Sequence, residues 1–216
     1  MSILVLGILA LIGYSLFSKG YFRFQPEGKL YESNSNIVYK FLAEKQSELV
    51  AFEQEEFSLI SGNKMKLKST SFFDKPIEGI LLSIYNEPFV AFKVIYHSEK
   101  LKTGVIGMAT RNNTYLYVMK KDHVDVFFDK KPLGTIQMGG KLFFPSTKTE
   151  IASYSLKNAT EYLIRVGGVP SAEVKHEIAE NSLPQRVVDT FDMQEASGDF
   201  AMRIMVFYLV GLGIKL

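Results

Sequence analysis

The sequence contains no cysteine, and this absence excludes several kinds of chemistry. Without a thiol the chain cannot form a disulfide, a thiolate zinc site or a cysteine nucleophile, and it cannot be S-palmitoylated. An excess of one charge is missing as well, because 25 basic and 23 acidic residues leave a formal net charge of +2. A nucleic-acid-binding surface requires a clustered basic excess, so the charge balance argues against a nucleic-acid partner.

Common catalytic motifs are also absent from the sequence. It has no Gly-x-Ser-x-Gly, no Gly-x4-Gly-Lys phosphate loop and no Gly-x-Gly-x-x-Gly. The three histidines, His97, His123 and His176, are isolated and lack the spacing that indicates a metal site. Gly104-Val-Ile-Gly107 falls within a predicted strand, where it indicates close backbone packing. We therefore expect a non-enzymatic protein, although an enzyme whose site leaves no recognisable motif, such as a hydrolase, stays open.

Residues 1–18 carry no charged side chain. As a helix they would reach about 27 Å, which is just enough to cross a thin bilayer. Lys19 and Arg23 follow directly, and no basic residue precedes the apolar run, so the basic region of a cleaved signal peptide is missing. The positive-inside rule then places the N-terminus outside and the following domain in the cytoplasm. We predict a single-pass transmembrane anchor; an atypical signal sequence or a helix buried against a partner are the alternatives.

Residues 19–60 are predicted to form a linker and an amphipathic helix. Ser33-Asn-Ser-Asn36 closes the linker, and Ser35 or Asn36 would cap a helix that runs from Ile37 to about Phe57. Its apolar face is formed by Ile37, Phe41, Leu42, Leu49 and Phe52. The opposite face is acidic, whereas helices that lie in a membrane interface usually carry basic residues there. We therefore expect the helix to dock on the domain.

From residue 61 to 216 the sequence is typical of an all-β domain. Ser61-Gly-Asn63 has the composition of a turn, and short aromatic or β-branched segments follow at regular spacing, separated by glycine, proline and asparagine. The predicted strands are Lys64–Phe73, Ile77–Ile84, Phe89–His97, Lys102–Arg111, Thr114–Lys120, Val124–Phe128, Leu133–Met138, Lys141–Phe144, Glu150–Leu156, Thr160–Val166, Ala172–Ile178 and Arg186–Gln194.

The last segment of the chain is apolar on all sides. Asp199 is a plausible N-cap, and Ile204–Ile214 has no polar face, so a helix there must be buried all round. Eleven helical residues span only about 17 Å, too short for a bilayer core. A closed sheet of about twelve strands leaves a lumen that such a helix would fill. The sequence thus predicts a mainly β fold, a closed antiparallel barrel that encloses its C-terminal helix. The buried helix positions are Ile204, Val206, Phe207, Leu209 and Val210.

This arrangement resembles the tubby-like superfamily, in which a twelve-stranded barrel surrounds a hydrophobic C-terminal helix. Two stretches carry the resemblance, Val124-Asp-Val-Phe-Phe-Asp-Lys-Lys-Pro-Leu-Gly-Thr-Ile136 and the strand, acidic turn and helix start from Val187 to Ile204. Within the superfamily they are most similar to the LURP-one-related proteins and the phospholipid scramblases. The similarity covers residues 60 to 216. The chain departs from scramblases in lacking a cysteine-rich palmitoylation tract, whose membrane attachment an N-terminal anchor would replace.

The resemblance implies lipid-headgroup contact through basic residues on the barrel. Lysines alternate on one predicted strand and cluster around one predicted hairpin, and each lysine near an anionic surface contributes about 1 kcal/mol to binding. Alternating lysines also keep an outward strand face soluble, which is the competing interpretation. The candidate residues are Lys64, Lys66, Lys68, Lys120, Lys121, Lys130 and Lys131.

The resemblance to scramblases also implies calcium binding just before the C-terminal helix. The candidate ligands are Asp189, Asp192, Glu195 and Asp199. Their spacing matches no EF-hand loop, and Asp189 and Asp192 would point to opposite faces of a strand. Ordinary solvated carboxylates are the alternative, and no other cofactor is expected.

Together these patterns predict a membrane-anchored binding or scaffold protein that recognises lipid headgroups or a protein partner. The predicted parts are an anchor (1–18), a linker with a helix (19–60) and a tubby-like barrel (61–216). Calcium-dependent lipid transport of the scramblase type is the alternative function.

Overall fold

A computed structural model describes residues 27–51, 54–66, 76–98, 103–145, 149–175, 185–191 and 196–214. The predicted membrane anchor, residues 1–18, lies outside these ranges. None of the helices within them is both long enough and apolar enough to cross a membrane.

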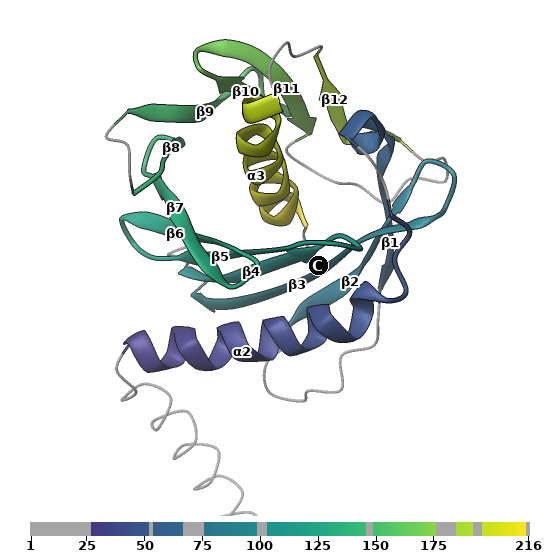
Figure 1. Cartoon of the computed structure of the whole chain (residues 1–216), viewed down its shortest axis with the longest axis vertical. Coiled ribbons are helices and arrows are strands. Elements are labelled where there is room, and N and C mark those ends of the chain that lie inside the picture. The colour runs from purple at the N-terminus through teal and green to yellow at the C-terminus, as the bar shows by residue number, and fades with distance from the viewer. Residues whose placement is uncertain are drawn as a thin grey trace, which may run out of the picture.

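Twelve strands form one antiparallel sheet whose spatial order is the order of the chain. They curl into a nearly closed barrel (Figure 1). The strands are β1 (Ile60–Lys66), β2 (Ile77–Ser83), β3 (Pro88–Ser98), β4 (Thr103–Ala109), β5 (Thr114–Met119), β6 (His123–Phe128), β7 (Lys131–Gln137), β8 (Lys141–Phe143), β9 (Glu150–Leu156), β10 (Glu161–Val166), β11 (Val169–Lys175) and β12 (Val188–Thr190). Each of the twelve predicted segments overlaps one of these strands, which confirms the mainly β barrel.

The ring of strands closes across a short seam between β1 and the residues just before β12. The Gly62 amide donates to the Gln185 carbonyl (2.9 Å), and the Val187 amide donates to the Ile60 carbonyl (3.1 Å). The predicted turn at residues 61–63 is therefore wrong: these residues belong to β1, at a point where its register with β2 shifts. The buried Ser61 hydroxyl donates to the Leu82 carbonyl (2.8 Å), so this polar side chain is satisfied inside the sheet.

The C-terminal helix α3 (Ala196–Gly213) runs inside the ring of strands (Figure 1). The five predicted core residues, Ile204, Val206, Phe207, Leu209 and Val210, each have no exposed surface. The helix begins three residues before Asp199, so the prediction that Asp199 caps it is wrong. Ala196, Ser197 and Gly198 belong to its first turn.

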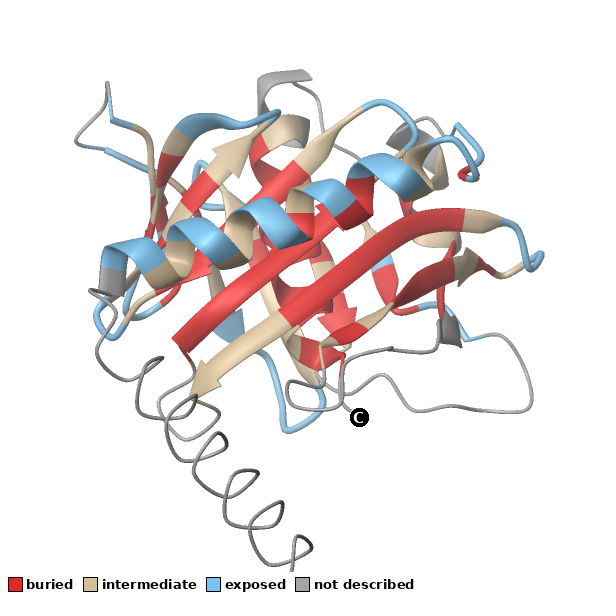
Figure 2. Cartoon of the chain, turned by 90° about the horizontal axis from the view of Figure 1, so that it is seen from below, coloured by how far each residue is buried: buried red, intermediate tan, exposed pale blue. Residues whose placement is uncertain are grey.

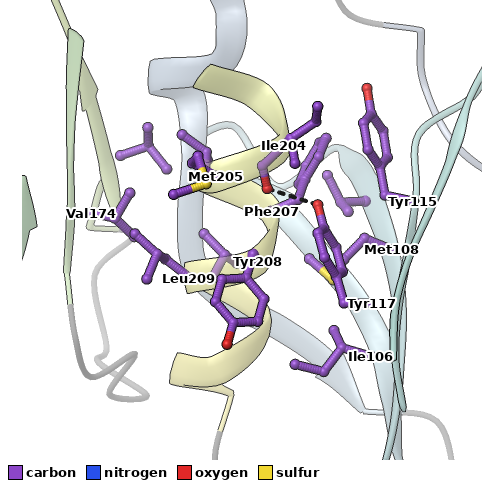
Figure 3. Close-up of a cluster of buried hydrophobic side chains, with 14 of the residues drawn as sticks. Ile106, Met108, Tyr115, Tyr117, Val174, Ile204, Met205, Phe207, Tyr208 and Leu209 are labelled. Carbon is purple, nitrogen blue, oxygen red and sulfur yellow. Dashed lines mark hydrogen bonds between the residues drawn. The ribbon is translucent and has the colours of Figure 1, made fainter. Parts of the chain in front are cut away.

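Aromatic rings join the inner face of the barrel to α3 (Figure 3). The Tyr117 hydroxyl on β5 donates to the Ile204 carbonyl (2.8 Å), and burial raises the pKa of this phenol well above its ordinary value. The Phe207 ring packs against the rings of Tyr115 (4.7 Å between centroids) and Phe57 (5.0 Å). The lumen is thus a packed core.

A second helix, α2 (Glu27–Gln46), lies outside the barrel across β3, β4 and β5, with one side in solvent (Figure 2). Val38, Phe41 and Leu42, at the i, i+3, i+4 spacing of one helix face, are buried against the sheet. A short 3-10 helix, η1 (Gln54–Leu59), leads from there into β1. The helix docks on the domain, as predicted, although its exposed charges are balanced, with Lys29 and Lys40 beside Glu32 and Glu44.

The predicted limits of this helix are wrong, because it starts ten residues before Ile37 and ends at Gln46. The polar residues taken for a linker lie within it, and two of them have hydrogen-bond partners there. The Ser35 hydroxyl donates to the Tyr31 carbonyl one turn earlier (2.7 Å), and the Asn34 amide lies 2.6 Å from a ring nitrogen of His97. Ile37, predicted on the buried face, is 48% exposed.

Strand β4 is buried at every position because a helix covers each of its faces. Val105 and Ala109 pack in the layer beneath α2, whereas Ile106 and Met108 pack in the barrel core with α3. Gly107 permits the close approach of α2, since a Cβ there would overlap the Val38 side chain and lie 3.0 Å from Leu42 Cδ1. The predicted close packing at Gly104-Val-Ile-Gly107 is confirmed.

Gly107→Ala should therefore lower the free energy of unfolding by about 2 kcal/mol, because overpacking a close contact typically costs 1–3 kcal/mol. Gly28→Ala is the matched control, since no atom lies within 4 Å of a Cβ at that helical position. It should leave stability unchanged or raise it by up to about 1 kcal/mol. Chemical denaturation of the full chain in neutral detergent measures both; equal effects would show that α2 does not press on β4 at this point.

Candidate functional site

A groove of about 340 Å³ lies between the first half of α2 and the outer faces of β5 and β6. This α2 groove is lined by Gly28, Tyr31, Glu32, Ser35, Tyr39, Leu116, Val118, Lys120, Asp125, Phe127 and Lys130.

The floor of the α2 groove is apolar. Side chains alternate along a strand, so on β5 Leu116 and Val118 point outward while Tyr115 and Tyr117 point into the barrel. Phe127 of β6 extends the floor and is only partly buried. Leu116 and Val118 are only 2% and 5% exposed, so the accessible apolar surface of the groove belongs to its partly buried residues, Tyr31, Tyr39 and Phe127.

Each end of the α2 groove holds one lysine, and the lining also contains two carboxylates, Glu32 and Asp125. Lys120, at the end of β5, places its ammonium 2.7 Å from an Asp125 carboxylate oxygen. Lys130, in the turn between β6 and β7, lies with its ammonium 5.7 Å from the centre of the Tyr39 ring. An anionic ligand with an apolar part would meet a cation at each end and an apolar floor between them.

Strand β6 separates the four lysines that were predicted to cluster around one hairpin. Lys120 and Lys121 belong to the turn before β6, whereas Lys130 lies in the turn after it and Lys131 begins β7. The prediction of a single cluster is wrong, because consecutive hairpins turn at opposite ends of a meander. The structure instead connects one lysine of each pair through the α2 groove.

Tyr39 contributes a buried hydroxyl to the wall of the α2 groove. Its oxygen has no hydrogen-bond partner among the described residues. Burial, together with the negative charge of Asp129, raises the pKa of Tyr39 to about 12. The phenol therefore stays neutral at physiological pH and can donate to an acceptor that a ligand supplies. An unsatisfied buried hydroxyl costs about 1–3 kcal/mol, so such an acceptor would be favoured.

The other predicted lipid contacts lie elsewhere. Lys64 and Lys66 are in β1, where they oppose Leu81 and Gly79 of β2, four strands away from β5. Their side chains, and the whole of Lys68, lie outside what the structure describes. Their contact with lipid stays a prediction.

The predicted calcium ligands are mostly beyond the described residues as well. Asp189 is exposed on β12, opposite Glu173 of β11. Asp192 and Glu195 lie outside the described ranges, and the Asp199 side chain is not described. Within those ranges, no group of three or more acidic or histidine side chains is placed to hold a metal ion.

Sequence reasoning did not identify the α2 groove. The β5 sequence Thr-Tyr-Leu-Tyr-Val-Met is apolar on both faces, so it predicts a strand buried on both sides. The structure does bury Leu116 and Val118, and the groove above them depends on where α2 begins, which was predicted at the wrong residue. The one available signal was the pair of charged turns on either side of β6.

No protein-family model, no curated protein and no solved structure matches the chain. The resemblance to tubby-like proteins accordingly stays a prediction, and the interpretation of the α2 groove depends on its own geometry.

Proposed function

We propose that the protein is a non-enzymatic, membrane-anchored binding protein whose α2 groove takes the headgroup of an anionic phospholipid. The observation that carries this proposal is the pair Lys120 and Lys130 at the two ends of an apolar floor. The phosphate would contact an ammonium, and the glycerol and upper acyl carbons would lie against the partly buried rings of Tyr31, Tyr39 and Phe127. The groove's volume falls in the usual range of small-molecule sites, about 300–1,000 Å³.

The predicted anchor supports the same assignment. Only residues 19–26 separate the apolar segment from the start of α2, and eight residues reach at most about 28 Å. The Tyr31 hydroxyl donates to the Met119 carbonyl (3.2 Å), so the first turns of α2 lie beside the Lys120 end of the groove. An anchor in the bilayer would therefore hold this end of the groove close to lipid headgroups.

The tubby-like resemblance is part of this proposal. A nearly closed twelve-stranded barrel with a C-terminal helix is the arrangement that the resemblance implies. A shared fold does not determine function, which depends on the site. The α2 groove therefore supports headgroup binding more strongly than the resemblance of fold does.

Removal of both groove lysines should abolish most of the binding. We expect Lys120→Gln/Lys130→Gln to weaken affinity for dihexanoyl phosphatidylglycerol about 30-fold, since each lysine contributes about 1 kcal/mol. Isothermal titration calorimetry of the full chain in neutral detergent measures it. The wild type should bind this anionic lipid saturably and in a salt-sensitive way, and should not bind dihexanoyl phosphatidylcholine.

Lys141→Gln/Lys157→Gln is the matched control, because it removes the same charge from β8 and from the end of β9, away from the α2 groove. These two lysines pair with Glu150 and Glu173. If both double variants weakened binding equally, the loss of affinity would be explained by the net charge of the protein, and the groove assignment would be overturned. Absence of any lipid binding by the wild type would overturn the lipid proposal. A protein partner would then be the expected occupant of the α2 groove.

Calcium-dependent lipid transport is our second proposal. It depends on Asp189, Asp192, Glu195 and Asp199, of which only Asp189 has a described side chain. No contact in the described part of the chain favours it over headgroup binding.

A further inference from the structure

The Lys120 end of the α2 groove contains a shared carboxylate. One oxygen of Asp125 lies 2.7 Å from the Lys120 ammonium, and the other lies 3.2 Å from Nε2 of His123. Nδ1 of His123 lies 2.8 Å from a carboxylate oxygen of Asp122. Lysine, two carboxylates and one imidazole thus form a continuous chain, the Lys120–Asp125–His123–Asp122 chain.

The geometry around His123 suits an imidazolium. A neutral imidazole has one N–H, so it can donate to only one of the two carboxylates, and its other nitrogen would face a carboxylate with a lone pair. A protonated ring donates to both. The hydrogen bond from His123 is the main cause that lowers the pKa of Asp122, which keeps that carboxylate charged.

The elements around His123 contribute few other charges. Lys121 is exposed in the same turn, and β7 places the uncharged Gln137 and Thr135 opposite His123 and Asp125. Helix α2 contributes Glu32 to the groove wall. Histidine is the side chain whose ordinary pKa lies between pH 5 and 8. His123 is therefore the proton-sensing member of the Lys120–Asp125–His123–Asp122 chain.

We infer that His123 makes anion binding in the α2 groove depend on pH, so that acidification strengthens it. This inference rests on the proposed function of the groove. When His123 is neutral, Asp125 serves as the counter-ion of Lys120 alone. When His123 gains a proton, the imidazolium also pairs with Asp125 and adds one positive charge. Asp125 then neutralises Lys120 less, so the Lys120 ammonium binds a phosphate oxygen more strongly.

The test compares the affinity of the full chain for dihexanoyl phosphatidylglycerol at pH 7.5 and pH 5.5. The phosphodiester of this lipid keeps one negative charge at both pH values, so any change in affinity must come from protonation of the protein. One added positive charge near an anion predicts about fivefold tighter binding at pH 5.5. His123→Gln should remove this gain, and Lys141→Gln/Lys157→Gln, which leaves the Lys120–Asp125–His123–Asp122 chain and the groove lining unchanged, should retain it.

A third variant separates the role of Asp125 from that of His123. Asp125→Asn removes the counter-ion of Lys120, so its affinity at pH 7.5 should reach that of the wild type at pH 5.5. Wild-type binding that is equal at both pH values, or a gain that persists in His123→Gln, would overturn the inference and leave the proposed function intact. No binding at either pH would overturn the proposed function itself.

Discussion

Replacing Leu209 of α3 by aspartate will abolish cooperative folding of the barrel. Leu209 has no exposed surface and packs in the centre of the lumen, where no described cation is placed to pair with a carboxylate. An unpaired buried charge costs several kcal/mol, and the lost packing of a buried leucine costs about 2–5 kcal/mol more. The sum approaches the whole stability of a typical domain, about 5–15 kcal/mol.

Thermal unfolding followed by circular dichroism measures this effect. Ile37→Asp is the matched control, because it introduces the same charge at an exposed apolar position of α2. It should change stability by less than about 0.5 kcal/mol. A chain that ends at Gly198 removes α3 without adding a charge and should also lack a cooperative transition. Cooperative unfolding in both altered chains would show that the strands fold without the helix.

Lys93→Met should lower the free energy of unfolding by about 3 kcal/mol. The Lys93 ammonium lies 2.5 Å from a Glu78 oxygen, and the two side chains are only 11% and 12% exposed. The Phe41 ring of α2 covers the pair at 4.9 Å from the ammonium. Removing the lysine would leave the Glu78 carboxylate uncompensated beneath a helix, and breaking a buried ion pair in this way costs about 3–5 kcal/mol. The residual exposure of the pair places the expected value at the lower end.

The double variant Glu78→Gln/Lys93→Met tests the reason for this loss. With both charges gone, no unpaired ion stays buried, so most of the stability should return. Lys45→Met is the surface control, since its partner Glu48 lies in solvent and such pairs contribute about 0.5 kcal/mol. If the double variant were as unstable as Lys93→Met alone, packing rather than charge would explain the effect. Urea denaturation gives all three values.

The strand pattern was predictable because its signals are local. Asn86, Asn112-Asn113 and Gly139-Gly140 interrupt the apolar segments, and the structure turns at each of them. Asn86, Gly139 and Gly140 adopt positive φ, which asparagine and glycine tolerate. The fully apolar run from Ile204 to Ile214 required burial on all sides, and the lumen provides it.

The start of α2 was not predictable from local signals. Residues 33–36 have loop composition; within the helix Ser35 donates to Tyr31 one turn earlier, and Asn34 reaches a distant strand. Asn34 meets His97, 63 residues further along the chain. At the other end, the Gln46 amide donates to the Thr110 carbonyl (3.1 Å). The helix is thus held in place at both ends by the barrel.

The candidate site was only partly predictable for the same reason. The basic character of Lys120 and Lys130 is visible in the sequence, but their relation through one groove depends on the position of α2. The shared carboxylate of Asp125 depends on the side-chain alternation that places it beside His123 and Lys120. Residues 192–195 lie outside the described structure, so most of the calcium hypothesis stays a prediction.

The seam of the barrel has a consequence for self-association. Every other neighbouring pair in the ring joins consecutive strands, whereas the seam joins residues 60–62 to residues 185–187, about 125 positions apart. Few backbone bonds hold it, and closing so long a loop carries a large entropic cost. Opening there would expose the unpaired edges of β1 and β12, and exposed edges readily pair with another chain. The seam is therefore the place where two copies would exchange strands.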